Sequence, residues 1–139
     1  MIKVVYDTNI IMSGFIWEGN ERQCIKKVEE NKVMLFLSEE IILEIYNVAK
    51  RGKFSDIIKE VKLTLDMLVR KILDMSEIVE SKRRTDVVLE DPKDIKFIEC
   101  AIAAKAPYIV SGDSHLLKLK KFEEIEIVTS KEFLSRIKV

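Results

Sequence analysis

Residues 2–9, Ile-Lys-Val-Val-Tyr-Asp-Thr-Asn, decide the fold that is expected for this chain. The run over residues 2–6 is mostly apolar and favours a strand, and it breaks at Asp7, Thr8 and Asn9. A short, nearly continuous apolar run of this kind is typical of a strand buried in a parallel sheet. We therefore predict that the chain opens with a buried strand and that Asp7 follows directly at its carboxyl end.

Other short apolar runs follow this one, and helical patterns separate them. Further strands are predicted over residues 33–37, 76–80, 108–110 and 125–128. Helices are predicted over residues 10–16, 20–30, 39–50, 54–60, 61–75, 92–105 and 114–119, with a last one opening near residue 129. Strands that alternate with helices predict an α/β fold with a parallel sheet, here of about five strands. We expect a single domain over residues 1–139, with a helical hairpin insertion around residues 54–75.

Composition narrows the class of protein. With 139 residues, 47% hydrophobic and 35% charged, the chain is long enough for one globular domain with a real core. Its 24 Lys and Arg balance 24 Asp and Glu, so any nucleic-acid site must come from local basic patches. Short apolar stretches predict no membrane span, and the N-terminus does not resemble a secretory signal. The two cysteines lack metal-type spacing, which favours reduced thiols in a cytoplasmic protein and leaves oxygen atoms to hold any metal.

Two acids follow predicted strands. Asp7 comes directly after the first strand, and Asp113 lies a few residues beyond the strand over residues 108–110. In parallel α/β sheets, ligands bind beyond the carboxyl ends of the strands, so neighbouring strands would bring both acids to one edge of the sheet. The alternative for each acid is that it only caps the helix that follows, because Asp is a favoured N-cap residue.

Two more acids lie at the border of apolar helix faces. Glu44 falls about 60° from Ile41 around its helix, and Asp94 about 40° from Ile98. An ionised carboxylate near a core is costly unless it is paired or bound to a metal. The alternatives are an edge side chain that reaches solvent for Glu44, and a first-turn carboxylate that interacts with the helix dipole for Asp94.

Four acids gathered in one cleft would repel one another, and a hard divalent cation such as Mg²⁺ or Mn²⁺ would relieve the repulsion. Such an ion activates water and offsets charge on a phosphoryl group, so the predicted reaction class is phosphodiester hydrolysis. Nucleophilic triads are excluded because the only histidine is His115, and the isolated glycines form no phosphate-binding loop.

Four segments in order, residues 2–9, 38–45, 91–101 and 108–117, resemble the PIN-domain family over nearly the whole chain. The resemblance implies a three-layer α/β sandwich in which Asp7, Glu44, Asp94 and Asp113 are the catalytic and metal-binding acids. It also implies supporting roles for three residues: Asn9, Ser111 and Asp91. Both Asp91 and Asp94 match acidic positions of the family, and Asp94 is preferred as the third metal ligand because it faces the apolar stripe.

The spacing is most similar to the prokaryotic branch of toxin components of toxin–antitoxin pairs, the VapC-like ribonucleases. This resemblance implies an endoribonuclease that depends on Mg²⁺ or Mn²⁺, a small antitoxin partner and a homodimer. The alternatives are a catalytically silent PIN-fold interaction module and a PIN nuclease of RNA processing.

Basic residues close to the predicted site are candidates for RNA contacts, with ordinary solvated charges as the alternative. Arg51 and Lys53 close the helix that carries Glu44, and Lys118 and Lys120 follow Asp113. The apolar stripe over residues 54–75 is broad, and we expect it to contribute to a dimer or antitoxin contact.

Overall fold

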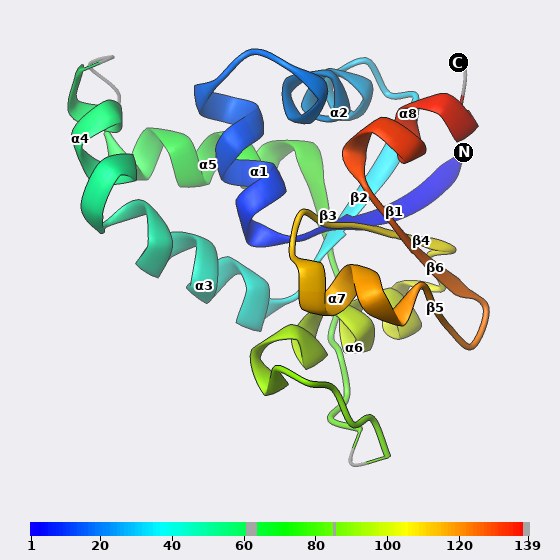
Figure 1. Ribbon diagram of the computed structural model, residues 1–139. Helices are drawn as coiled ribbons and strands as arrows, with labels where there is room; N and C mark the ends of the chain where they lie inside the picture. Colours follow the sequence, from blue (N-terminus) through cyan, green and yellow to red (C-terminus); the bar gives the residue numbers. More distant parts are fainter. Residues whose placement is uncertain (61–63, 85, 138–139) are drawn as a thin grey trace.

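The computed structural model describes residues 1–60, 64–84 and 86–137 (Figure 1). The strands are β1 (Ile2–Tyr6), β2 (Val33–Leu37), β3 (Ser76–Ile78), β4 (Tyr108–Val110), β5 (Lys121–Phe122) and β6 (Ile125–Val128). The helices are α1 (Thr8–Ile16), α2 (Asn20–Glu29), α3 (Glu39–Ala49), α4 (Gly52–Glu60), α5 (Leu65–Met75), the 3₁₀ turn η1 (Pro92–Asp94), α6 (Ile95–Ala104), α7 (Ser114–Leu119) and α8 (Ser130–Ile137).

The strands form one sheet in the order β3-β2-β1-β4-β6-β5, and every neighbouring pair is parallel except β5 with β6. The predicted α/β fold with a largely parallel sheet is therefore confirmed. The sheet has one strand more than predicted, because β5 is only two residues long and such a run carries no periodicity. Strand β3 ends at Ile78 instead of residue 80, and the helix predicted to start at Pro92 begins as a 3₁₀ turn.

Helices cover both faces of the sheet. Helices α1, α2 and α8 lie on one face, and α6 and α7 lie on the other (Figure 1). The ring of Phe133 on α8 packs edge-on against Tyr6 and Tyr108, with centroids 6.0 and 5.5 Å apart. The hydroxyl of Tyr6 donates to the carbonyl of Cys24 on α2 at 2.9 Å, which ties β1 to the same layer. These contacts hold the end of β1 in a fixed position, and that end carries the candidate site.

Helices α4 and α5 agree with the helices predicted over residues 54–75, although residues 61–63 of the second prediction lie outside the described residues. Helix α5 begins after Thr64, whose hydroxyl accepts a hydrogen bond from the backbone N–H of Met67 at 3.1 Å. The description of this pair as an insertion stays a prediction. Within the described ranges, no helix combines the length and apolar character that crossing a membrane requires.

The order in which strands are added to the sheet reverses at its centre, between β1 and β4. Strand β1 lies between β2 and β4, and the connections run from β1 toward β2 on one side and from β4 toward β6 on the other. Tyr6 pairs with Val110, and the N–H of Asp7 donates to the carbonyl of Val110 at 3.0 Å. In open α/β sheets, ligands bind at such a switch point, beyond the carboxyl ends of the strands.

Candidate metal centre

Asp7 caps helix α1 and also faces the end of β4. Its Oδ1 accepts a hydrogen bond from the backbone N–H of Ile10 at 2.8 Å, as an N-cap does. Its Oδ2 accepts hydrogen bonds from the hydroxyl of Ser111 at 2.5 Å and from the N–H of Gly112 at 3.3 Å. Burial raises the pKa of Asp7, the three hydrogen bonds oppose this rise, and the carboxylate of Asp113 adds to it. Asp7 therefore caps α1 with one carboxylate oxygen and is held at the end of β4 by the other.

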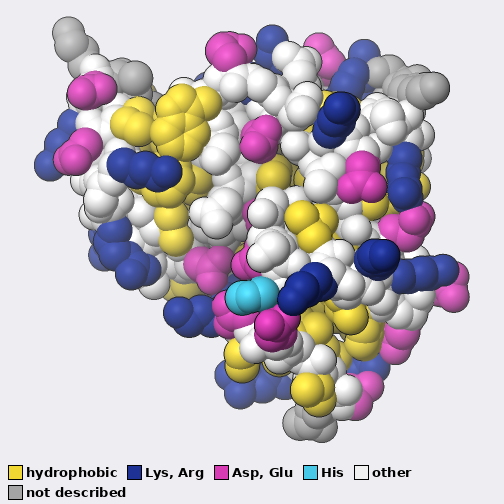
Figure 2. Space-filling view, in the orientation of Figure 1, with side chains coloured by type: hydrophobic (Ala, Val, Ile, Leu, Met, Phe, Trp, Pro, Cys, Tyr) yellow, Lys and Arg dark blue, Asp and Glu magenta, His cyan; other side chains and the backbone are white. Residues whose placement is uncertain are grey.

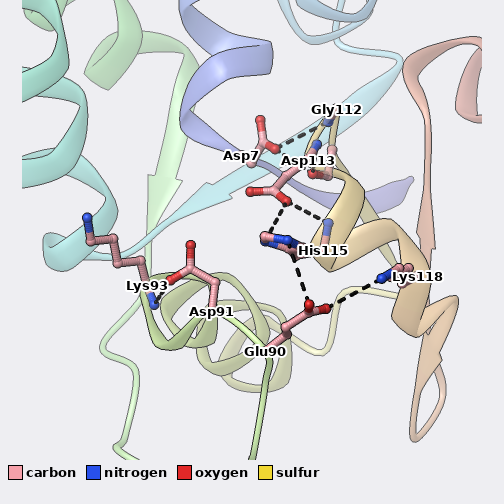
Figure 3. A network of polar contacts seen from close by, with 9 residues as sticks. Asp7, Glu90, Asp91, Lys93, Gly112, Asp113, His115 and Lys118 are labelled. Carbon is pink, nitrogen blue, oxygen red and sulfur yellow. Dashed lines mark hydrogen bonds and ion pairs between the residues drawn. The ribbon is translucent and has the colours of Figure 1, made fainter.

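Asp113 is fixed in a similar way at the start of α7. Its Oδ1 accepts a hydrogen bond from the N–H of His115 at 2.7 Å, and its own N–H donates to the hydroxyl of Ser111 at 2.9 Å. The Ser111 hydroxyl, fully buried, thus contacts both acids, because it also donates to Asp7. Figure 3 shows the carboxyl groups of Asp7 and Asp113 approaching each other from their two segments.

Asp91 and Asp94 come from the 3₁₀ turn that precedes α6. Asp91 caps the turn, because its Oδ1 accepts from the N–H of Lys93 at 3.0 Å (Figure 3). Asp94 is only 7% exposed, and its Oδ2 has no hydrogen-bond partner among the residues that the structure describes. Burial, followed by the negative charges of Asp113, Asp91 and Asp7, raises the pKa of Asp94 to about 6, against a smaller opposing effect of Lys96. The turn therefore places a buried carboxylate close to other negative charges, with one oxygen that has no hydrogen-bond partner among the described residues.

Three of these acids form a group that we call the acid cluster: Asp91, Asp94 and Asp113. Each offers a carboxylate oxygen, and these oxygens lie within 4.8 Å of one another. A buried carboxylate oxygen without a partner, surrounded by like charges, is costly unless a cation is present. Oxygen ligands in this number and spacing suit a hard divalent ion. The residues therefore fit the metal that the sequence led us to expect.

Glu44 lies beside this group but is not part of the acid cluster. Its Oε1 accepts a hydrogen bond from the hydroxyl of Thr8 at 2.5 Å, and its Oε2 forms an ion pair with the ammonium of Lys96 at 2.6 Å. The contact to Thr8 links Glu44 to the residue after Asp7, and the contact to Lys96 links it to the first turn of α6. Of the predicted acids, the structure thus groups Asp94 and Asp113 together with Asp91, and it leaves Glu44 paired with a cation of the protein itself.

Thr8 and Lys96 are the contacts that sequence reasoning missed. Thr8 follows the first acid and was predicted only as part of the break between the first strand and the helix over residues 10–16. Lys96 is two residues from Asp94, and on a helix such a pair points about 200° apart, so spacing alone gives no reason to link them. Their partner Glu44 is 36 residues from Thr8 and 52 from Lys96.

The remaining predicted residues lie outside the acid cluster. Asn9 is exposed in the first turn of α1. The guanidinium Nε of Arg51 donates to the carbonyl of Asn47, while the ammonium of Lys53 lies 5.3 Å from the ring of Trp17.

On the α7 side, Lys118 pairs with Glu90 at 3.8 Å, and Glu90 also pairs with His115 at 3.8 Å (Figure 3). Lys120 is exposed and ends α7 with a positive φ of 62°. Figure 2 shows His115 in cyan among acidic side chains, with basic side chains on both sides of them.

The chain matches a known protein family. A family model described as PIN domain matches residues 3–115. The chain belongs to the PIN domain family, as its sequence motifs predicted.

Among solved structures, the chain is similar to the crystal structure of VapBC2 from Rickettsia felis bound to a DNA fragment from their promoter. The TM-score is 0.61 at 16% identity, and the match covers 91% of this chain and 97% of that chain. At this identity the likeness shows a shared fold. No curated protein sequence matches the chain significantly.

Proposed function

We propose that this protein is an endoribonuclease that depends on Mg²⁺ or Mn²⁺ and acts as the toxin component of a toxin–antitoxin pair. The observation that carries the proposal is the buried Oδ2 of Asp94, which has no partner among the described residues and lies within the acid cluster at the switch point of a PIN fold. Protein interiors rarely leave such an atom unsatisfied without a ligand to meet it.

The acids would divide the work of holding the ion. Asp94 and Asp113 would bind it directly, with Asp91 or Asp7 completing the set. Ser111 would orient Asp7 and Asp113 together through its single hydroxyl. When bound, a divalent ion lowers the pKa of water and offsets charge on the phosphoryl oxygens, which is the chemistry that phosphodiester hydrolysis needs.

RNA is the proposed substrate, bound by exposed cations on either side of the acids. Arg51 and Lys53 lie beyond the end of α3, and Lys118 and Lys120 lie on and after α7. Phosphate contacts of this kind are not sequence-specific, so they would position the chain of the RNA and not select its bases.

The likeness to the VapBC2 complex supports a small antitoxin as partner, and we propose a homodimer in addition. Exposed apolar side chains on α5, with Met67 54% and Leu73 38% exposed, are candidates for one of these contacts. A catalytically silent interaction module and a nuclease of RNA processing are the competing functions. The first would gain no thermal stability from Mn²⁺, and the second would cut RNA without arresting growth when expressed in a bacterial host.

The decisive experiment is a cleavage assay on mixed single-stranded RNAs with Mg²⁺ or Mn²⁺, with EDTA as a control. Wild-type protein should cut, while Asp7→Asn and Asp113→Asn should not. Asp66→Asn is a matched control, because Asp66 is an exposed first-turn acid of α5 away from the acid cluster. Metal-dependent cutting that persists in both site variants would refute the assignment.

A further inference from the structure

Lys96 is a partly buried cation next to the acid cluster. Its side chain is 15% exposed, and its ammonium lies 2.6 Å from Glu44 Oε2 and donates to the carbonyl of Lys93 at 2.6 Å. The same ammonium lies 5.5 Å from the centre of the Phe97 ring. A lysine with these contacts is held in one place, unlike a surface lysine that moves freely in solvent.

The ion pair with Lys96 leaves Glu44 less suited to bind a metal ion. One of its oxygens accepts from Thr8 and the other from Lys96, so the carboxylate is already satisfied and its charge is balanced. Asp94 differs, because its Oδ2 has no partner among the described residues, and each of three acids, Asp113, Asp91 and Asp7, acts on it more strongly than the positive charge of Lys96. Metal affinity is therefore expected at the acid cluster and not at Glu44.

A second divalent ion bound by Glu44 would also lie close to the Lys96 ammonium. Like charges a few ångströms apart repel strongly in a partly buried site. We infer that the site holds one divalent ion, at the acid cluster, and that Lys96 takes the place of a second ion on the Glu44 side. Lys96 is then a positioning residue, which fixes Glu44 and through it Thr8, the neighbour of Asp7. This inference rests on the proposed metal-dependent function.

The number of bound ions tests the inference without any activity readout. Isothermal titration with Mn²⁺, together with Mn²⁺ electron paramagnetic resonance, should count one ion per full-length wild-type chain. Asp94→Asn should weaken Mn²⁺ binding by about tenfold or more, and Glu44→Gln by less than about threefold. Two ions in the wild type, or equal losses in the two variants, would overturn the inference.

Variants of Lys96 test whether this residue limits the number of bound Mn²⁺ ions to one. Lys96→Met should release Glu44 and allow a second, weaker Mn²⁺ ion, whereas Lys96→Arg should keep the count at one because it keeps the charge. Lys93→Met is the matched control, because only the backbone carbonyl of Lys93 contacts Lys96. A count of one in Lys96→Met, with its thermal unfolding in EDTA still cooperative, would refute the role of Lys96.

The comparison of Glu44→Gln with Asp94→Asn decides the question even if Lys96→Met does not fold. Failure of the proposed function looks different from failure of this inference. Wild-type protein that binds no Mn²⁺ and cuts no RNA would remove the proposed function, whereas an active nuclease with two bound ions would remove only the single-ion inference.

Discussion

The two sides of the candidate site handle negative charge in opposite ways. On the side of β4 and η1, the acid cluster collects three carboxylates, and the Oδ2 of Asp94 has no hydrogen-bond partner among the described residues. On the side of α3, Glu44 receives a lysine and a threonine. The predicted acids therefore differ in how their charge is met: Glu44 is paired within the protein, whereas Asp94 keeps a buried oxygen whose burial is costly without a partner.

The largest expected difference between the acid cluster and Glu44 is in the rate of RNA cleavage. Asp94→Asn and Asp113→Asn should each lower the rate of RNA cleavage by about 10²-fold or more, because each removes a charge that holds the ion. Initial rates at saturating Mn²⁺ measure the loss, with Asp66→Asn as control. Rates within twofold of the wild type for both variants would contradict the claim that the acid cluster holds the ion.

Metal binding should also stabilise the fold. Mn²⁺ at about 100 times its dissociation constant should add about 2.7 kcal/mol to the free energy of unfolding, or roughly 5–10 °C in Tm. Asp94→Asn should lose most of this gain, while Glu44→Gln should keep it. Differential scanning fluorimetry with and without EDTA gives the answer, and an unchanged wild-type Tm would favour a silent interaction module.

Without metal, the charge of Asp94 should make stability depend on pH. Burial and the neighbouring acids raise the pKa of Asp94 to about 6 from 3.8, so the folded protein binds a proton that the unfolded chain releases. Stability in EDTA should therefore rise as the pH falls from about 7 to about 5, by about 1–2 kcal/mol relative to Asp94→Asn. Urea unfolding of both proteins at several pH values measures this, and parallel pH profiles would contradict it.

The smallest effect is expected on the compensated side. Glu44→Gln should lower the free energy of unfolding by about 1 kcal/mol, because the Glu44 and Lys96 side chains are 28% and 15% exposed and solvent screens the pair in part. Adding Lys96→Met to Glu44→Gln should recover part of this loss. A double-mutant cycle on unfolding free energies measures the coupling, and a value near zero would show that the pair contributes nothing.

Most of the fold could be predicted because the strands and helices show in the spacing of apolar residues and in the residues that start helices. The apolar run over residues 2–6 and the helix start at Asp91 and Pro92 each depend on neighbouring residues alone. The two-residue strand β5 escaped prediction, since it exists only through its pairing with β6. Among the acids, the nearness of Asp94 and Asp113 was predictable from a strand end and a helix face. The sequence offered Asp91 and Asp94 as alternatives for one position, and the structure places oxygens of both near Asp113.

The sequence by itself determined that strands alternate with helices, that Asp7 and Asp113 follow strands, and that the chain resembles one family. Only the tertiary structure decided which acids share a space and which are neutralised. The reason is that Glu44 and Lys96 are 52 residues apart, on separate helices. Their meeting depends on how α3 and α6 pack against each other, and no local pattern records the distance between two helices that far apart in the chain.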